Sequence, residues 1–205
     1  MRVGGVVLCG GQSRRMGRPK ATLPFGNEVM LTRVLRLLGD VVSPLVVVAA
    51  PMQLLPKLPE QVMLARDRSE GRGPLEGLYS GLLAVSTLVE AAYVTACDVP
   101  LLQHDFVRYM IEHLKDADVA VPTDGTFYHP LSAVYRTSIV NVIGDCVAEE
   151  RLKVTGFYDQ VQVNSVPLHQ LRTVDADLES LMNVNNPADY HLALQRANLS
   201  QKSTD

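Results

Sequence analysis

Apolar residues along the chain follow two patterns that alternate with each other. Short Val-rich runs without strict polar alternation are typical of strands buried on both faces of a mainly parallel sheet. They predict strands at residues 3–9, 45–50, 62–65, 92–97, 119–121, 131–135 and 161–166. Between them, apolar residues recur at helical spacing and predict helices at residues 30–38, 75–89, 106–114, 139–147 and 187–197.

The alternation of strands and helices predicts an α/β fold with three α/β/α layers around a mainly parallel central sheet. A chain of 205 residues is typical of one domain, so we expect a single domain over residues 1–198. Residues 199–205 are expected to form a flexible polar tail. The last helix has a clear start signal, because Asn186 can cap it and Pro187 suits its first position.

The stretch 10–26 shows no periodicity, and a loop of this length in a compact domain is usually functional. Gly10 and Gly11 open it at the end of the first predicted strand, and four cations follow within seven residues: Arg14, Arg15, Arg18 and Lys20. Glycines leave backbone N–H groups open to a phosphate, whose oxygens arginine and lysine bind well. The loop therefore predicts a polyphosphate site, although a solvated basic loop is the alternative. It matches neither G-x-x-x-x-G-K-[ST] nor G-x-G-x-x-G.

Two further segments carry candidate chemistry. Asp98 directly follows the predicted strand 92–97, so its carboxylate is expected at the same sheet edge as Gly10. Mg²⁺ prefers oxygen ligands, typically one or two carboxylates together with a triphosphate. Gly73 and Pro74 open a predicted helix whose first N–H groups are unpaired and can face a nucleotide.

The composition narrows the classes of partner. Hydrophobic residues make up 47% of the chain, and its formal net charge is -3 at pH 7. We therefore expect a substantial core and no nucleic-acid or membrane partner. No stretch approaches the ~20 apolar residues of a membrane span, and the N-terminus lacks the sections of a signal peptide. The cysteines fit no zinc or redox spacing and are expected to be buried, reduced thiols of a cytoplasmic protein.

Several motifs together resemble one family. Leu8-Cys9-Gly10-Gly11, Ser13-Arg14-Arg15-Met16-Gly17 and Pro19-Lys20 look like the signature of nucleotidyltransferases with a GT-A-type, Rossmann-like fold. The chain most resembles the molybdenum cofactor guanylyltransferases. Further segments of this likeness are Gly73-Pro74-Leu75, Cys97-Asp98-Val99-Pro100, His129-Pro130 and Asn183-Val184-Asn185-Asn186-Pro187. The resemblance extends from residue 3 to about residue 197.

The resemblance implies a reaction and a set of roles. It implies transfer of GMP from GTP to molybdopterin, with Mg²⁺ as cofactor and pyrophosphate as leaving group. Catalytic roles fall to Lys20, Arg15 and Asp98, and metal binding to Asp98 and Asn185. The implied nucleotide-binding residues are Leu8, Cys9, Gly10, Gly11, Arg14, Lys20, Asp67, Gly73, Pro74, Leu75 and Asp98. The implied acceptor-binding residues are His129, Arg136 and Arg151.

Other functions stay open at this point. Gly10 favours the guanylyl branch over the cytidylyl branch, which more often reads L-A-A-G, whereas Ala49 stands where many guanylyltransferases have an asparagine. The alternatives are a cytidylyl- or sugar-nucleotide transferase on the same fold and a non-catalytic nucleotide-binding protein. A third is a module that binds molybdoenzymes or their chaperones, which is compatible with catalysis.

Overall fold

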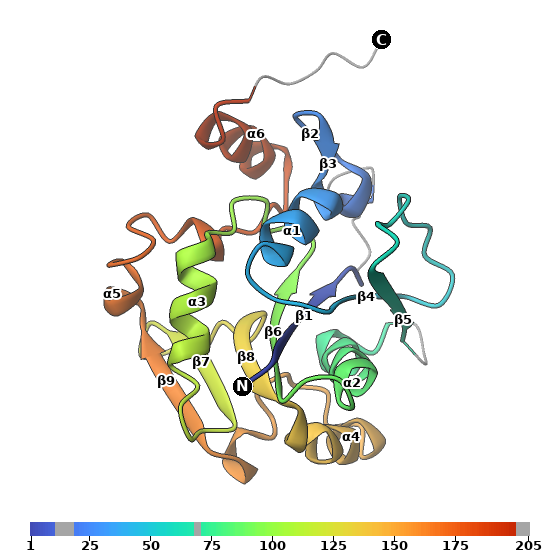
Figure 1. Ribbon diagram of the computed structural model, residues 1–205, viewed down its shortest axis with the longest axis vertical. Helices are drawn as coiled ribbons and strands as arrows, with labels where there is room; N and C mark the ends of the chain where they lie inside the picture. Colours follow the sequence, from blue (N-terminus) through green and yellow to red (C-terminus); the bar gives the residue numbers. More distant parts are fainter. Residues whose placement is uncertain (11–18, 68–70, 200–205) are drawn as a thin grey trace.

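The computed structural model describes residues 1–10, 19–67 and 71–199, and its centre is a seven-stranded sheet (Figure 1). The strands follow the order β5-β4-β1-β6-β8-β7-β9 across the sheet. Their bounds are β1 (Val3–Leu8), β4 (Leu45–Ala49), β5 (Val62–Arg66), β6 (Ala91–Ala96), β7 (Val119–Thr123), β8 (Ser132–Arg136) and β9 (Val163–Pro167).

Neighbouring strands of this sheet are parallel except where β8 takes part. β1 pairs with β4 and β6 in parallel, and β4 pairs with β5 in parallel. β8 runs antiparallel to both of its neighbours, β6 and β7, whereas β7 and β9 are parallel. The prediction of a mainly parallel sheet is therefore confirmed.

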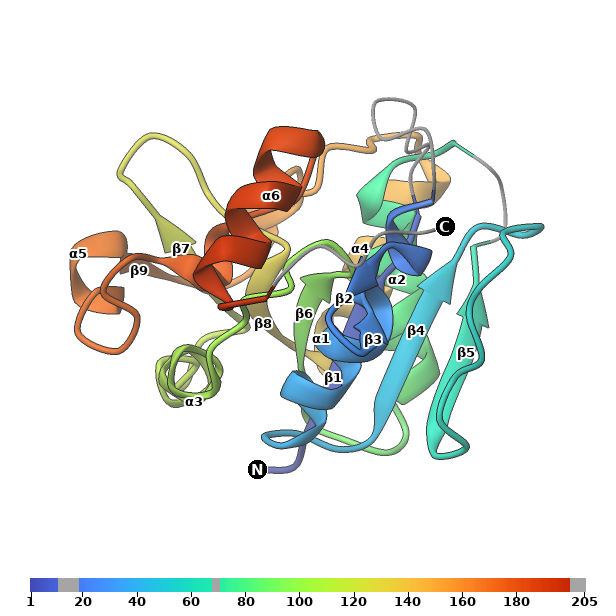
Figure 2. The same cartoon turned by 90° about the horizontal axis from the view of Figure 1, so that it is seen from above.

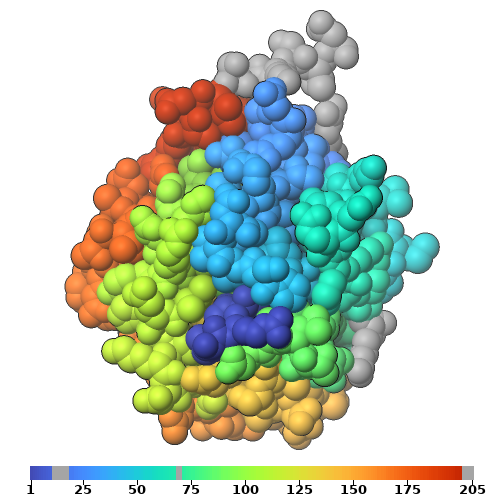
Figure 3. All heavy atoms as spheres, viewed as in Figure 1, coloured from blue at the N-terminus to red at the C-terminus, as the bar shows by residue number. Residues whose placement is uncertain are grey.

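Helices cover both faces of the sheet (Figure 2). They are α1 (Met30–Gly39), α2 (Pro74–Val85), α3 (His104–Glu112), α4 (Val140–Ala148), α5 (Leu168–Leu171) and α6 (Pro187–Arg196). α1 and α3 pack in one hydrophobic cluster with the sheet, and α2 and α4 pack in a second cluster on its other face. The three-layer α/β/α prediction is confirmed. Figure 3 shows α1 and α3 side by side on the first face, with the segment that joins β4 to β5 next to α1.

Some element bounds differ from the sequence-based prediction. The helix predicted at 75–89 ends at Val85, where the N–H of Ser86 donates to the Leu83 carbonyl, three residues back. The stretch 10–26 contains a 3-10 turn at Lys20–Thr22 and the strand β2 (Pro24–Phe25), which pairs with β3 (Glu28–Val29). Elements of two or three residues are too short to show a hydrophobic period, so the sequence did not predict them.

The layers approach each other closely at Gly81 of α2. A Cβ atom there would lie 2.3 Å from Cγ1 of Val6 in β1, so only a glycine lets the helix pack this near the strand. This contact fixes α2, and with it the helix N-terminus that begins at Pro74, against the centre of the sheet.

A third, smaller cluster lies above the sheet between α6, the N-terminus of α1 and the β2–β3 hairpin (Figure 1). It buries Leu23, Phe25 and Val184, which lie close in sequence to candidate site residues. Leu199, the first residue of the expected tail, packs against this cluster, and the remaining tail residues lie outside the described part of the chain. No helix in the described ranges is long and apolar enough to cross a membrane.

Candidate active site

The carboxyl ends of the parallel strands meet at one edge of the sheet, and most candidate residues lie there. Gly10 follows β1, Asp67 follows β5 and Asp98 follows β6. Leu8 pairs with Ala96 in the register of β1 and β6, which brings the segments after these two strands side by side. This is the edge at which open α/β sheets bind their ligands.

Two segments that are distant in sequence converge on Lys20. Its Nζ donates to Oδ2 of Asp98 at 2.7 Å and to Oδ1 of Asn185 at 2.7 Å. Nδ2 of Asn183 donates to the other oxygen of Asp98, Oδ1, at 3.3 Å. The backbone N–H of Val184 also donates to the Asp98 carbonyl at 2.9 Å. Lys20, Asp98 and Asn185, which were predicted to act together, thus lie in direct contact.

The start of α6 holds the asparagine segment in place. The Asn186 side chain accepts a hydrogen bond from the N–H of Asp189 at 3.0 Å, as its predicted capping role requires. Oδ2 of Asp189 accepts in return from the N–H groups of Asn185 and Asn186, at 2.8 and 3.2 Å. This capping box fixes the backbone at Asn185 and so directs its side chain toward Lys20.

The oxygens around Lys20 suit a hard divalent cation. An ammonium group lies between a carboxylate oxygen and an amide oxygen, so a positive charge is already stabilised at this position. Asp98 and Asn185 supply the oxygen type that Mg²⁺ prefers. Among residues 1–10, 19–67 and 71–199, no three His, Cys, Asp or Glu side chains converge on one point. Further ligands at Asp98 would therefore come from substrate oxygens or water, as is usual for Mg²⁺.

Asp67 faces Gly10 and α2 across the same edge. A Cβ on Gly10 would lie 3.6 Å from Oδ2 of Asp67, and a Cβ on Gly77 would lie 3.7 Å from Oδ1. Burial, reinforced by the negative charge of Glu76, raises the pKa of Asp67 to about 6. Its buried Oδ1 has no hydrogen-bond partner among the described residues. Such an oxygen can accept a hydrogen bond from a ligand.

Gly73 is the N-cap residue of α2, the helix that Asp67 faces. This residue has φ +78°, a conformation that glycine adopts readily, and its side-chain-free position leaves the first helical N–H groups uncapped. The side chains of Leu8, Cys9 and Leu75 are buried in the protein. Their predicted contacts with a nucleotide would therefore be made by the main chain.

The comparison with known proteins identifies the family. The model of the MobA-like NTP transferase domain matches residues 5–161. This chain belongs to that family. Probable molybdenum cofactor guanylyltransferases are 37% identical in Pelotomaculum thermopropionicum (90% of this chain, 88% of the relative) and 38% identical in Mycobacterium tuberculosis (93% and 92%).

Solved structures support the same fold for this MobA-like NTP transferase. Molybdopterin-guanine dinucleotide biosynthesis protein A from Archaeoglobus fulgidus superposes with a TM-score of 0.76 over 97% of this chain and 99% of that chain. The identity is 20%, so this likeness concerns the fold alone. The predicted Rossmann-like nucleotidyltransferase fold is thereby confirmed.

The three predicted acceptor residues of this family member lie in different places. His129 precedes β8 at the same edge as Asp98, and burial lowers its pKa. Arg151 follows α4 and forms an exposed ion pair with Glu149 at 2.7 Å. Arg136 pairs with Ala91 at the opposite end of β6, so the structure does not bring it to the Lys20–Asp98 site. Its guanidinium donates instead to the carbonyls of Ala117 and Lys115.

The antiparallel direction of β8 relative to β6 explains the position of Arg136. The amino end of β8 lies beside the carboxyl end of β6, where Thr95 pairs with Ser132, and Arg136 ends the strand at the other side. The predicted phosphate-binding residues Gly11, Arg14 and Arg15 lie outside the described residues.

Gln53 is a residue of this edge that sequence reasoning missed. Its Nε2 donates to the Cys9 carbonyl at 2.8 Å, and its Oε1 accepts from the N–H of Ala50 at 3.2 Å. Gln53 thus ties the segment after β4 to the end of β1, directly before Gly10. It follows Ala49, which is fully buried and offers no side-chain donor. No motif or periodicity at Gln53 signals this contact.

Proposed function

We propose that this chain transfers GMP from GTP to molybdopterin, releasing pyrophosphate and forming the guanine dinucleotide cofactor. The observation that carries this proposal is the convergence of Lys20, Asp98 and Asn185 at the carboxyl edge of a nucleotidyltransferase fold. The names of the relatives, probable molybdenum cofactor guanylyltransferases, support the choice of GTP and molybdopterin as substrates.

The metal in this proposal is Mg²⁺, held by Asp98 and Asn185. When bound, it would offset negative charge on the triphosphate. In this proposal Lys20 exchanges its present partners for triphosphate oxygens, and Arg15 binds the same group. Both cations stabilise the charge that develops on the departing pyrophosphate.

The nucleophile in this proposal is the terminal phosphate of molybdopterin, which attacks the α-phosphorus of GTP. This phosphate is already ionised, so the protein needs no dedicated base. Its task is to position two anions and to offset their charge. His129 and Arg151 are the proposed acceptor-side residues, since His129 lies at the required edge and Arg151 has an exposed guanidinium.

Asp67 is the proposed selector for guanine. Its carboxylate can accept hydrogen bonds from N1–H and N2–H₂ of guanine, which cytosine does not offer in the same arrangement. The raised pKa, about 6, leaves the side chain ionised at neutral pH. In this proposal the N–H groups of Gly73 and Leu75 contact the same nucleotide, as does Gly10.

One experiment tests this function directly. The purified protein is incubated with Mg²⁺, molybdopterin cofactor and one nucleoside triphosphate at a time, and pyrophosphate release is followed. We expect release with GTP and not with CTP, ATP or UTP, together with a guanine dinucleotide product. Release with CTP in place of GTP would assign the cytidylyl alternative. Tight GTP binding without pyrophosphate would indicate a non-catalytic nucleotide-binding protein.

The cellular setting belongs to the same proposal. We place the reaction in the cytoplasm, where the buried free thiols of Cys9, Cys97 and Cys146 would stay reduced. Molybdoenzymes or their chaperones are the proposed recipients of the product.

A further inference from the structure

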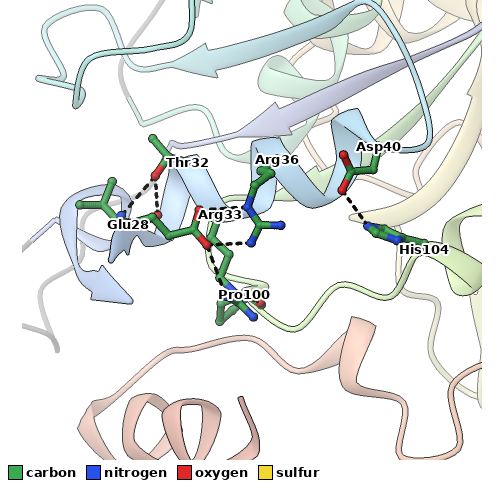
Figure 4. A network of polar contacts seen from close by, with 8 residues as sticks. Glu28, Thr32, Arg33, Arg36, Asp40, Pro100 and His104 are labelled. Carbon is green, nitrogen blue, oxygen red and sulfur yellow. Dashed lines mark hydrogen bonds and ion pairs between the residues drawn. The ribbon is translucent and has the colours of Figure 1, made fainter. Parts of the chain in front are cut away.

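Arg33 of α1 contacts both the segment that follows Asp98 and the β2–β3 hairpin (Figure 4). Its Nε donates to the carbonyl of Pro100 at 2.7 Å, two residues after Asp98. Its other end donates from NH1 to Oε1 of Glu28 at 3.3 Å, and its guanidinium carbon lies 4.7 Å from the centre of the Phe25 ring. One side chain thus links the aspartate segment to the β2–β3 hairpin.

The hairpin is in turn joined closely to Lys20. The N–H of Leu23 donates to the Lys20 carbonyl at 3.1 Å, and the N–H of Met30 donates to the Leu23 carbonyl at 2.8 Å. Phe25 is fully buried, so the hairpin has a fixed place in the third hydrophobic cluster. A shift of the Arg33 guanidinium would therefore move the hairpin, and through Leu23 it would move Lys20.

Both the shape and the environment of this contact require an arginine. The Arg33 side chain is only 19% exposed, and burial lowers its pKa while Glu28 partly compensates. A planar guanidinium can donate in two directions and stack on a ring, whereas a lysine ammonium offers a single point of charge. A lysine here could reach the carboxylate of Glu28 or the carbonyl of Pro100, but would not reproduce the stacked, forked geometry.

We propose that Arg33 is a positioning residue, which holds the Lys20 segment and the Asp98 segment at the separation that the metal and the triphosphate require. This inference rests on the proposed function of the same site. Arg33 touches neither substrate nor metal in this role. It acts through Pro100 on one side and through Glu28 and Phe25 on the other.

Arg36 provides a matched control on the same helix. Its Nε and NH2 donate to Glu28 at 3.3 and 2.8 Å, so it shares one partner with Arg33. Its side chain is 51% exposed, and within the described ranges it makes no hydrogen bond to the Asp98–Pro100 segment. Arg36→Gln therefore removes an ion pair with Glu28 and leaves the link to Pro100 intact.

The test compares Arg33→Met, Arg33→Lys and Arg36→Gln with the wild type. Turnover, KM for GTP and the Mg²⁺ concentration at half-maximal rate are measured, and the binding of Mn²⁺ with GTP is followed by electron paramagnetic resonance. Since misplacement of about 1 Å can cost up to a hundredfold in rate, we expect Arg33→Met to lose at least about tenfold in kcat. Weaker metal binding should accompany this loss. Arg33→Lys should be intermediate, and Arg36→Gln should stay within about twofold of wild type.

Several results would overturn the inference. A folded Arg33→Met variant with normal kcat and normal metal dependence would do so, as would an equal loss in Arg36→Gln. If Arg33→Met does not fold, Arg33→Lys provides the test. Wild-type kcat and metal dependence in Arg33→Lys would contradict the need for a guanidinium. A wild-type protein without turnover would refute the proposed function alone, because Mn²⁺–GTP binding still measures the effect of Arg33.

Discussion

At the scale of single residues, the central feature is a lysine whose ammonium lies between two candidate metal ligands. Lys20 is close to 2.7 Å from both Asp98 and Asn185, and the side chains of Lys20 and Asp98 are 18% and 10% exposed. A pair this shielded from water is screened less by salt than an exposed ion pair. In the proposed reaction, nucleotide and metal would replace these contacts as they bind.

Asp98→Asn and Lys20→Ala should both abolish most of the activity. In the proposed reaction Lys20 offsets phosphate charge directly, and Asp98 would hold the Mg²⁺ that does so. Loss of such a stabiliser costs roughly 10²–10³ in rate. Pyrophosphate release with saturating GTP and molybdopterin cofactor measures the effect as kcat. Asp105→Asn is a suitable control, because Asp105 is exposed on α3 and, among the described residues, forms an ion pair only with Arg108. Near-normal turnover in both site variants would contradict the assignment.

Asp67 should give the stability of the protein a pH dependence of its own. Burial and the charge of Glu76 raise the pKa of Asp67 from 3.8 to about 6 in the folded state. Between these values the folded state holds the proton more tightly than the unfolded state, so the free energy of unfolding falls as pH rises. Asp67→Asn cannot ionise, and its stability relative to wild type should increase from about pH 4 to pH 7.

Urea unfolding of both proteins at several pH values measures this difference. Glu76→Gln serves as a companion variant, because removal of the neighbouring charge should lower the pKa of Asp67 in the folded state. The pH range over which stability changes should then be narrower. A stability difference between wild type and Asp67→Asn that is constant across this pH range would show that Asp67 titrates elsewhere.

At the scale of elements, the longer helices and the buried strands were predictable, whereas the small connecting elements were not. α1 repeats apolar residues over several turns, and β1, β4 and β6 are continuous apolar runs, so local pattern suffices. The β2–β3 hairpin forms because Phe25 is buried in the cluster with α6 and α1. That burial depends on helices distant in sequence, which a local pattern does not contain.

The start of α6 is the element whose cap matters most to the site. Asn186→Ala removes the side chain that accepts from Asp189, and loss of such a cap costs about 1 kcal/mol of stability. Because the same capping box holds the backbone of Asn185, we also expect weaker Mg²⁺-dependent GTP binding. Urea unfolding and calorimetric titration measure the two effects. Asn141→Ala, at an exposed position of α4, should leave both unchanged or slightly raise stability.

Across the whole molecule, the site joins segments that otherwise belong to different packing clusters. Asp98 follows a central strand, while Lys20 and Asn185 flank the cluster formed by α6, α1 and the hairpin. A ligand that contacts all three should therefore stabilise the folded chain as a unit, since it binds the native state and not the unfolded one.

Mg²⁺ with GTP should raise the melting temperature measurably. At a ligand concentration of about 100 Kd the stabilisation is roughly 2.7 kcal/mol, and this corresponds to roughly 5–10 °C for a chain of this size. Differential scanning fluorimetry with GTP, with and without EDTA, measures the shift. The Asp98→Asn variant should lose the part of the melting-temperature shift that depends on metal. An equal shift for CTP, or one that EDTA does not reduce, would contradict the proposed site.

By itself, the sequence determined the features that depend on neighbouring residues. These are the alternation of strands and helices, the cap at Asn186 and the glycine that leads out of β1. Local periodicity and backbone preference act over a few residues, so they can be recognised before the chain is folded. The edge of the sheet that carries Gly10 and Asp98 followed from the same reasoning, because parallel strands end on the same side.

Only the tertiary structure decided which distant side chains meet. The bond from Lys20 to Asn185 joins residues 165 positions apart, and the link from Arg33 to Pro100 spans 67 positions. Because β8 is antiparallel to β6, Arg136 lies beside the amino end of β6, at the edge opposite Asp98. Such contacts depend on strand direction, register and the packing of whole helices. They arise from the combined burial of many residues, which no single segment of sequence encodes.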